Sequence, residues 1–365
     1  GPSARYNPMA ALDPKLDSFG TDCDNIADSI VVRETGAQPN HWDDSAHGLI
    51  AALIGHLAAN MSADESKTLA MVRTIICKPK LLEAQARAAQ DGNDEFVAEA
   101  LDPFTDLNAP NKGELASIIS TARTQTRFLG TKAIAENLSG SDFRFRELKE
   151  RPTTVYLTLP TRYLATCSKW FRLVVASALD DLLREESGLP VLVILDEFYQ
   201  LGRLKVIQNA MALARGYGLQ LWPIIQDLTQ LKEWYKESWE TFLGNAGIRQ
   251  FFAPRENTTA EYVSKLCGET TVTVSSSSSG RSQQDILLGP APTINEGTSA
   301  NQAQRRLFLP QEVCQLPDDQ FLMFADKGSK AVIRGYRLPY WEIPEFQGKY
   351  SPDPYHLKSK PKVSP

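Results

Sequence analysis

Two adjacent carboxylates, Asp196 and Glu197, directly follow the apolar run VLVIL at residues 191–195. In proteins that hydrolyse nucleotides, such acids stand at the carboxyl end of a central strand. There an aspartate holds Mg²⁺ through water, and a glutamate orients or deprotonates the attacking water. A simpler interpretation is that Asp196 caps the following helix and Glu197 faces solvent. The segment alone leaves both interpretations open.

Two other polar side chains lie beside a second apolar run, LQLWPIIQ, at residues 219–226. Gln226 ends this run, and an amide next to an acid pair can sense a γ-phosphate or position water; alternatively it caps the next helix. Arg215 precedes the run. It can reach the nucleotide of a neighbouring subunit, where negative charge develops on the transferred phosphoryl group, or it can complement the C-terminal end of its own helix.

The elements that must position these side chains follow residue 151, where strand and helix patterns alternate. The apolar run that ends at the acid pair has no polar residue, as expected for a strand that helices cover on both faces. This alternation predicts an α/β fold with a doubly wound parallel sheet. The predicted strands are 153–160, 189–198, 219–226, 248–254, 321–328 and 331–341, and the predicted helices are 163–186, 205–218, 229–245 and 258–268.

A different pattern precedes this region. Residues 41–138 show helical periodicity only, broken by Gly, Asn, Asp and Pro, and nothing there is typical of a strand. We therefore predict an all-α domain over residues 36–150, inserted into an α/β domain that comprises a short N-terminal part (1–35) and a main part (151–345). Limits near 36 and 150 follow from the change of pattern.

Two segments have a biased composition. Residues 275–306 are rich in Ser, Gly and Asn, which favours a flexible loop. Residues 346–365 are rich in Pro and Lys and are expected to form an extended tail.

The composition excludes several classes of protein. The 365 residues carry a net charge of −5, so a nucleic-acid-binding surface has to be local. Five scattered cysteines without a CxxC pair indicate a reducing compartment and neither a disulfide framework nor a zinc site. No apolar run is long enough to cross a bilayer, and residues 1–9 do not resemble a signal peptide, so the chain as given is expected to be cytoplasmic.

Seven segments in order resemble the TraG-like coupling proteins of type IV secretion and conjugation systems. They are RYNPMAALDP, LSGSDF, TTVYLTLP, VILDEFYQLGRL, ARGYGLQLWPIIQDLTQL, NAGIRQFFAPRENTTAEYVSKLCG and LPDDQFLMF, and they extend over nearly the whole chain. The resemblance implies a RecA-like P-loop NTPase domain interrupted by an all-α domain. It also implies ATP-driven transfer of DNA or protein through a secretion machine.

The resemblance assigns roles to the four side chains. Asp196 and Glu197 match the Walker B acids, with Asp196 on Mg²⁺ through water and Glu197 catalytic. Gln226 matches the glutamine after the next strand, and Arg215 matches the trans-acting arginine. ATP and Mg²⁺ are the implied cofactors, with Asp196, Glu197 and Gln226 in contact with them.

The resemblance also implies partners and a location. The implied partners are a relaxase bound to single- or double-stranded DNA, or an effector protein, together with inner-membrane secretion components. The full-length protein is expected to be a homo-hexamer anchored in the bacterial inner membrane and facing the cytoplasm.

One departure from the family concerns catalysis. The sequence has no GxxxxGK[ST] phosphate-binding loop, which in the family lies upstream of the RYNP segment. We therefore expect the chain to be a truncated piece, which binds Mg·ATP weakly and does not hydrolyse it alone. The alternatives are a degenerate relative without hydrolysis and a non-catalytic adaptor that recruits substrate.

Two sets of basic residues are candidates for contact with nucleic acid. Arg123, Arg127 and Lys132 lie near a predicted helix end with Phe128 among them, a combination that suits phosphate contacts and base stacking. A solvated helix face is the simpler explanation of these residues. Arg305 and Arg306 flank the Ser-rich segment and could face the pore of a ring.

Overall fold

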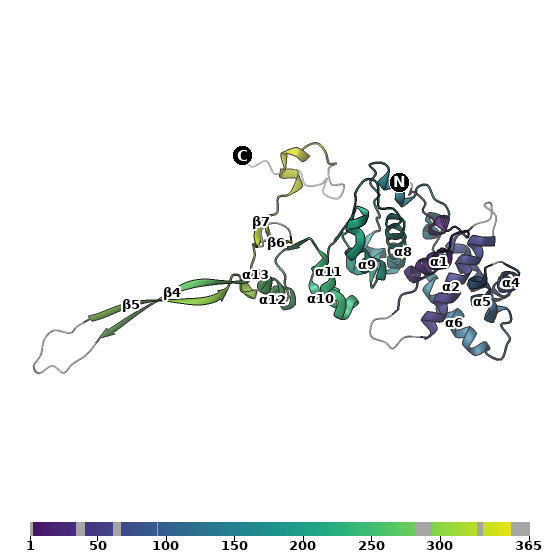
Figure 1. Cartoon of the computed structure of the whole chain (residues 1–365), viewed down its shortest axis with the longest axis horizontal. Helices are drawn as coiled ribbons and strands as arrows, with labels where there is room; N and C mark the ends of the chain where they lie inside the picture. The colour runs from purple at the N-terminus through teal and green to yellow at the C-terminus, as the bar shows by residue number, and fades with distance from the viewer. Residues whose placement is uncertain are drawn as a thin grey trace, which may run out of the picture. The chain divides into compact units, whose positions relative to one another are not determined.

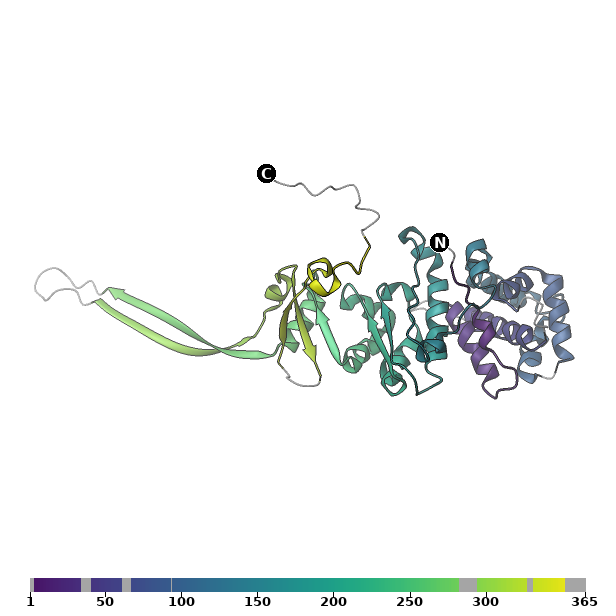
Figure 2. The same cartoon turned by 90° about the horizontal axis from the view of Figure 1, so that it is seen from above.

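The computed structural model describes residues 3–33, 41–60, 67–92, 94–281, 294–326 and 331–351, and the side chains of 276–281 and 294–300 are outside this description. The chain forms two compact units (Figures 1 and 2). The first unit contains residues 1–226 and 230–245, and the second contains 227–229 and 246–365.

Helices make up the first part of the first unit, as the sequence predicted for residues 41–138. The central helix, α2, is apolar on most of its surface, and Leu49, Ile50, Leu53, Ile54 and Leu57 are almost completely buried. It contacts α1, α3, α5 and α6, which gather around it in Figure 1. The helices are α1 (Phe19–Ile30), α2 (His41–Asn60), α3 (Leu69–Cys77), α4 (Pro79–Gln90), α5 (Glu95–Leu101), α6 (Lys112–Gln125) and α7 (Lys132–Asn137).

Helix α8 (Leu164–Leu182), which lies in the region of alternating strands and helices, packs against α1. Both the all-helical region and the start of the α/β region therefore belong to one compact unit. Just beyond the end of α8, Arg184 donates to Asp22 on α1 at 2.9 Å and to Asp180 at 2.7 Å. The predicted domain limits near 36 and 150 stay predictions, and residues 34–40 lie outside the described part of the chain.

The acid pair is positioned by strands β1 (Val191–Leu195) and β2 (Leu219–Pro223), which pair in parallel as predicted. The expectation that helices cover both faces is wrong for the residues the structure describes. Val191 and Leu195 are buried, but Leu192 and Ile194 on the other face are 50% and 54% exposed. The register places Ile194 opposite Trp222, which is also about half exposed, so one sheet face is apolar and open.

The predicted strand at residues 153–160 is not a strand in this structure. Its side chains do alternate in exposure, since Tyr156 is 84% exposed whereas Val155 and Leu157 are half-buried. A strand also requires a neighbour to hydrogen-bond with, and no described residue pairs with this segment.

Short helical segments follow each of the two strands β1 and β2. Their order is η6 (Phe198–Leu201), α9 (Lys205–Leu213) and η7 (Ala214–Tyr217), and after β2 come α10 (Leu228–Tyr235), η8 (Lys236–Ser238) and α11 (Trp239–Asn245). The predicted helices over 205–218 and 229–245 are thus confirmed, each with a break into a 3₁₀ turn.

The second unit contains a three-stranded sheet in the order β3 (Ile248–Phe251), β6 (Gln320–Ala325) and β7 (Ile333–Tyr336). Both pairings are antiparallel, which differs from the all-parallel sheet expected from the alternation. Helices α12 (Asn257–Leu266) and α13 (Pro310–Cys314) contact each other, and Val263, Val313, Leu316, Leu322 and Phe324 form the core of this unit.

The prediction of a flexible loop over 275–306 is wrong for the described residues. Strands β4 (Glu269–Arg281) and β5 (Ile294–Arg306) form a continuous antiparallel ribbon, visible in Figures 1 and 2. The residues just before this segment, ETTVTV at 269–274, are almost all β-branched, a strand signal that the serine-rich composition after them obscured. Residues 282–293 lie outside the described part.

The remaining expectations concern the C-terminal segment and membranes. Residues 340–346 form two 3₁₀ turns, η9 (Tyr340–Glu342) and η10 (Pro344–Phe346), and most of the predicted tail lies outside the described residues. Within the described ranges, no helix combines the length and the apolarity that a membrane crossing requires.

A glycine before β1 provides a test of this architecture. Gly188 has φ +105°, and a Cβ there would stand 2.7 Å from the carbonyl oxygen of Lys149, which accepts the Leu189 N–H. We expect Gly188→Ala to lower the free energy of unfolding by about 1–3 kcal/mol or more, because it adds a clash to an unfavourable backbone conformation. Urea denaturation measures this change.

Gly216→Ala is the matched control. A Cβ added at Gly216 would have no heavy atom within 4 Å, and Gly216 has no positive φ, so its replacement should change the stability by less than about 0.5 kcal/mol. Equal effects of the two substitutions would contradict the described position of β1.

Candidate nucleotide site

The acid pair lies at the carboxyl end of β1 and is open to solvent. Asp196 and Glu197 are both exposed, and neither side chain forms a hydrogen bond or ion pair with a residue that the structure describes. Glu197 occupies the N-cap position of η6 without a side-chain cap bond. The capping interpretation therefore has no support in the geometry, and both carboxylates are available for a ligand.

Gln226 lies at the same edge of the sheet. The register pairs Leu195 with Pro223, and the Ile224 N–H donates to the Leu195 carbonyl at 3.0 Å. Three residues after Pro223, Gln226 is exposed, and its backbone N–H donates to Gln230 Oε1 at 3.1 Å. Because parallel strands end at the same edge, β1 and β2 bring the acid pair and Gln226 to one side of the sheet, as the sequence predicted.

Arg215 lies at the opposite edge. It belongs to η7, which leads into the amino end of β2, and its side chain is exposed. A five-residue strand is about 16 Å long, so this arginine is separated from the acid pair of its own chain by roughly the length of the strand. Within a single chain the structure does not bring Arg215 together with the other three candidate residues.

Aromatic packing holds the loop after the acids. Phe198 is buried, with its ring 6.1 Å from that of Tyr235 and 5.8 Å from that of Phe242. Next to it, the Tyr199 hydroxyl donates to Glu233 Oε2 at 2.8 Å. Burial raises the pKa of Tyr235 to about 12, so this phenol stays neutral and its oxygen accepts the Leu204 N–H at 3.4 Å. The turn that begins at Glu197 is thus fixed against α10 and α11.

The donor set suits a hard cation that keeps most of its waters. Asp196, Glu197 and Gln226 offer carboxylate and amide oxygens, which Mg²⁺ prefers. In the described part of the chain, no group of three or more His, Cys, Asp or Glu side chains converges as a metal site. Two open carboxylates fit a Mg²⁺ bound mainly through water and phosphate oxygens, and they do not form a complete protein cage.

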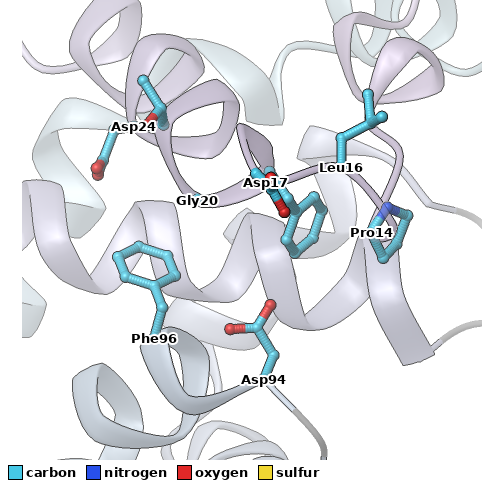
Figure 3. Close-up of a pocket in the computed structure, with 9 residues that line it drawn as sticks. Pro14, Leu16, Asp17, Gly20, Asp24, Asp94 and Phe96 are labelled. Atoms are coloured by element: carbon cyan, nitrogen blue, oxygen red, sulfur yellow. The ribbon is translucent and has the colours of Figure 1, made fainter.

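A separate hollow of about 410 Å³ lies among the helices, between the segment before α1 and the start of α5. Figure 3 shows Asp94 and Phe96 across from Asp17 and Gly20, with Asp24 nearby. Three carboxylates line this hollow, so it repels phosphate. It contains none of the four candidate residues and is not the nucleotide site.

The structure gives the candidate nucleic-acid residues different surroundings. Arg127 and Lys132 are exposed, and Lys132 forms an ion pair with Glu136 at 3.8 Å. Arg123 donates from Nε to the Ile76 carbonyl at 3.1 Å, and Phe128 is only 6% exposed, so its ring does not present a face for base stacking.

The two arginines at the base of the ribbon are engaged in ion pairs. Arg305 pairs with Glu312, and Arg306 pairs with Glu261 at 2.9 Å. These contacts tie the ribbon to α13 and α12.

Arg172 on α8 also organises this region, although the sequence did not indicate it as a site residue. It is buried and donates to the carbonyl oxygens of Leu201 and Arg203, just after the acid pair. The only signal was a lone arginine within the apolar stretch WFRLVVASAL.

Comparison with known proteins identifies the relatives of this chain. Residues 1–363 match the family described as "Type IV secretory system Conjugative DNA transfer". The conjugal transfer protein TraG of Escherichia coli is 27% identical over 339 residues, covering 86% of this chain and 52% of the relative. The coupling protein VirD4 of Bartonella henselae is 24% identical over 308 residues, covering 80% and 45%. The chain thus spans about half the length of these relatives.

Solved structures of one protein share the fold. The plasmid coupling protein TrwB in complex with ADP and Mg²⁺ matches with a TM-score of 0.63 at 15% identity, covering 92% of this chain and 71% of that chain. An unbound form, TrwBdeltaN70, matches with a TM-score of 0.59 at 17% identity and the same coverage. The predicted α/β, RecA-like fold class is confirmed.

The open carboxylates permit a test of the capping alternative. We expect Asp196→Ala to change the free energy of unfolding by less than about 0.5 kcal/mol, because the exposed side chain forms no hydrogen bond or ion pair with a described residue. Removal of a true cap costs about 1 kcal/mol. Thermal or urea denaturation of the 365-residue chain measures the difference.

Glu256→Ala supplies the positive control. Glu256 is the N-cap of α12, and its carboxylate accepts the N–H groups of Thr258 and Thr259 at 2.5 and 2.6 Å. If Asp196→Ala destabilises the chain as much as Glu256→Ala does, Asp196 has a structural role after all.

Proposed function

The chain belongs to the type IV secretory system conjugative DNA transfer family, and from this premise we propose that it is part of a coupling protein that uses ATP hydrolysis to pass substrate to a secretion channel. The observation that carries the proposal is the arrangement at the sheet edge. Asp196 and Glu197 stand without partners among the described residues, beside a strand end that carries Gln226. A nucleotide site requires a carboxylate for the metal ion and another for the attacking water at this position.

Asp196 directly follows β1 and would hold Mg²⁺ through water. When bound with a nucleoside triphosphate, the metal ion neutralises charge on the phosphate oxygens. Asp196 contributes a carboxylate directly after β1, and all five residues of β1 are paired with β2. This placement holds the backbone of Asp196 at the sheet edge and leaves its exposed carboxylate available to a ligand.

Glu197 would act on the attacking water as a general base or as an orienting acceptor. Its exposed carboxylate has no described partner, so it can accept a hydrogen bond from water without breaking another contact. Gln226 on the neighbouring strand end would contact the γ-phosphate or the same water through its amide.

Arg215 would act on the nucleotide of the neighbouring subunit. Its position at the amino edge of β2, across the sheet from the acids, makes action within its own chain unfavourable. A homo-hexameric ring would bring the arginine edge of one subunit to the acid edge of the next. In the same ring, the exposed Arg127 and Lys132 would contact single- or double-stranded DNA. Further candidates for this contact are Arg123, Arg305 and Arg306.

A phosphate-binding loop is needed to complete the site, and the 365 residues contain no GxxxxGK[ST]. The chain matches about half the length of its relative TraG of Escherichia coli, which supports a loop supplied by a further segment of the protein. Two carboxylates with no cation beside them repel nucleotide phosphates. The 365-residue chain alone is therefore expected to bind Mg·ATP weakly.

In the whole protein, substrate recruitment would precede hydrolysis. The substrate would be a relaxase–DNA complex or an effector protein, and inner-membrane components of the secretion system would receive it. Anchoring in the bacterial inner membrane, with this part facing the cytoplasm, is part of the same proposal. A non-catalytic adaptor remains the alternative outcome of the tests below.

The first test concerns Glu197. In the full-length protein with its phosphate loop, Glu197→Gln should retain ATP binding and lower the turnover rate by about a hundredfold or more, because the amide is a poor base. Phosphate release and calorimetry measure the two quantities. The 365-residue chain, measured in parallel, should show neither micromolar ATP binding nor turnover.

Two results would count against this assignment. Glu197-dependent hydrolysis by residues 1–365 alone would require a phosphate site elsewhere in the chain. Full-length protein whose substrate transfer survives Glu197→Gln unchanged would favour the adaptor.

The second test concerns Arg215. Arg215→Ala in the full-length ring should lower turnover by about a thousandfold, with nucleotide binding nearly unchanged, because an arginine finger acts mainly in the transition state. Mixing Arg215→Ala subunits with Glu197→Gln subunits should restore part of the activity, since some interfaces then combine an intact Glu197 with an intact Arg215. No recovery on mixing, with both variants forming rings, would exclude action in trans.

A further inference from the structure

Arg172 on α8 is a buried cation whose hydrogen bonds all end on backbone carbonyl groups. Its side chain is 6% exposed. Nε donates to the Ser29 carbonyl at 3.0 Å, and Nη2 donates to the Asp28 carbonyl at 3.1 Å. Nη1 donates to the carbonyls of Leu201 at 3.0 Å and Arg203 at 2.5 Å. One guanidinium group thus joins two segments that are more than 170 residues apart in the sequence.

The geometry of this contact is specific to arginine. Burial lowers the pKa of Arg172 to about 10, so the group remains charged at neutral pH and its desolvation must be offset by hydrogen bonds. The planar guanidinium fixes the directions of its N–H groups, and therefore fixes the two pairs of carbonyls relative to each other. A lysine keeps the charge but has one nitrogen, which cannot reach both pairs at once.

Gly202 forms the turn that presents two of these carbonyls. It lies between Leu201 and Arg203, with φ +64° and ψ −162°, a region that is open essentially to glycine alone. A Cβ at this position would still find space, since the nearest atom is Arg172 Nη1 at 3.7 Å. The need for glycine therefore comes from the backbone conformation that turns both carbonyls toward Arg172.

The Gly202 turn is directly connected to the acid pair. Leu201 is the last residue of η6, and η6 begins immediately after Glu197. Within this turn the Gln200 N–H donates to the Glu197 carbonyl at 3.0 Å. A displacement of Leu201 would therefore be passed through a single 3₁₀ turn to the backbone of Glu197.

The other end of the Arg172 contact belongs to the helical part. Asp28 and Ser29 lie in the last turn of α1. Two residues beyond α1, Val32 is held by Gln125 of α6, which accepts from the Val32 N–H at 3.2 Å and donates to its carbonyl at 3.1 Å. The end of α1 is thus held by Arg172 from one side and by α6 from the other.

We propose that Arg172 is a positioning residue that fixes the acid pair through the Gly202 turn and ties its position to the end of α1 and the helical part. The structural half of this inference is independent of any activity. Its effect on turnover rests on the function proposed above.

Hydrogen exchange of the 365-residue chain tests the structural half. In Arg172→Lys, the amides of residues 197–204 should exchange about tenfold faster or more, because the carbonyls lose their donors and the turn opens locally. Gly202→Ala should have the same effect on the same amides without changing any charge. It also provides a second measurement if Arg172→Lys folds poorly.

Arg184→Gln is the matched control. Arg184 also joins α8 to α1, through Asp180 and Asp22, but it forms no hydrogen bond or ion pair with the described residues 197–204. Its loss should accelerate exchange in α1 and leave the amides of 197–204 unchanged. Equal exchange at 197–204 in wild type and Arg172→Lys, or equal acceleration in Arg172→Lys and Arg184→Gln, would overturn the proposal.

Kinetics of the full-length protein test the functional half. Arg172→Lys and Gly202→Ala should lower kcat for ATP hydrolysis by about tenfold to a hundredfold, with KM within about twofold, because misplaced acids affect the chemical step more than binding. An unchanged kcat in both variants would overturn the positioning role. If the wild-type protein itself shows no turnover, the proposed function fails, and the exchange experiment still decides the structural contact.

Discussion

Backbone hydrogen bonds from Val191 to Gly218 and from Ile224 to Leu195 hold β1 and β2 in parallel, and the candidate site depends on this ladder. A parallel pair cannot be joined by a tight hairpin, so the chain returns through α9 and η7 before β2 begins. Both strands therefore end at one edge and start at the other. This arrangement gathers Asp196, Glu197 and Gln226 at one edge and leaves Arg215 at the other.

The surroundings of the acid pair differ from those of two buried or half-buried arginines in this unit, Arg172 and Arg184. Arg184 and Asp22 satisfy each other, and Arg172 is satisfied by carbonyls. Asp196 and Glu197 have no such partner among the described residues, although the turn behind them is fixed by Phe198 and by Leu201. A well-held backbone with unengaged side chains is the condition under which a ligand can be bound with little reorganisation.

The sequence predicted the features that depend on local pattern. The periodicity of α2 and the apolar runs of β1 and β2 follow from residues close together in the chain, and their elements are confirmed. The segment 153–160 has the pattern of a strand but lacks a pairing partner in the described residues, which no local signal reveals. Arg172 was missed for a related reason: its acceptors lie 29 to 144 residues away. The roles of Asp196, Glu197, Gln226 and Arg215 stay predictions.

The β4–β5 ribbon has a mechanical consequence. Its 13 residue pairs give a length of about 40 Å, and its described base is attached to the rest of its unit by the ion pairs of Arg305 and Arg306. When α12 and α13 rotate, the displacement of the ribbon therefore grows with the distance from its base. At this length a tilt of about 10° moves the far end by about 7 Å. A displacement too small to disturb the packing of Val263 and Val313 can thus become, at the distal end of the ribbon, a movement as large as a side chain.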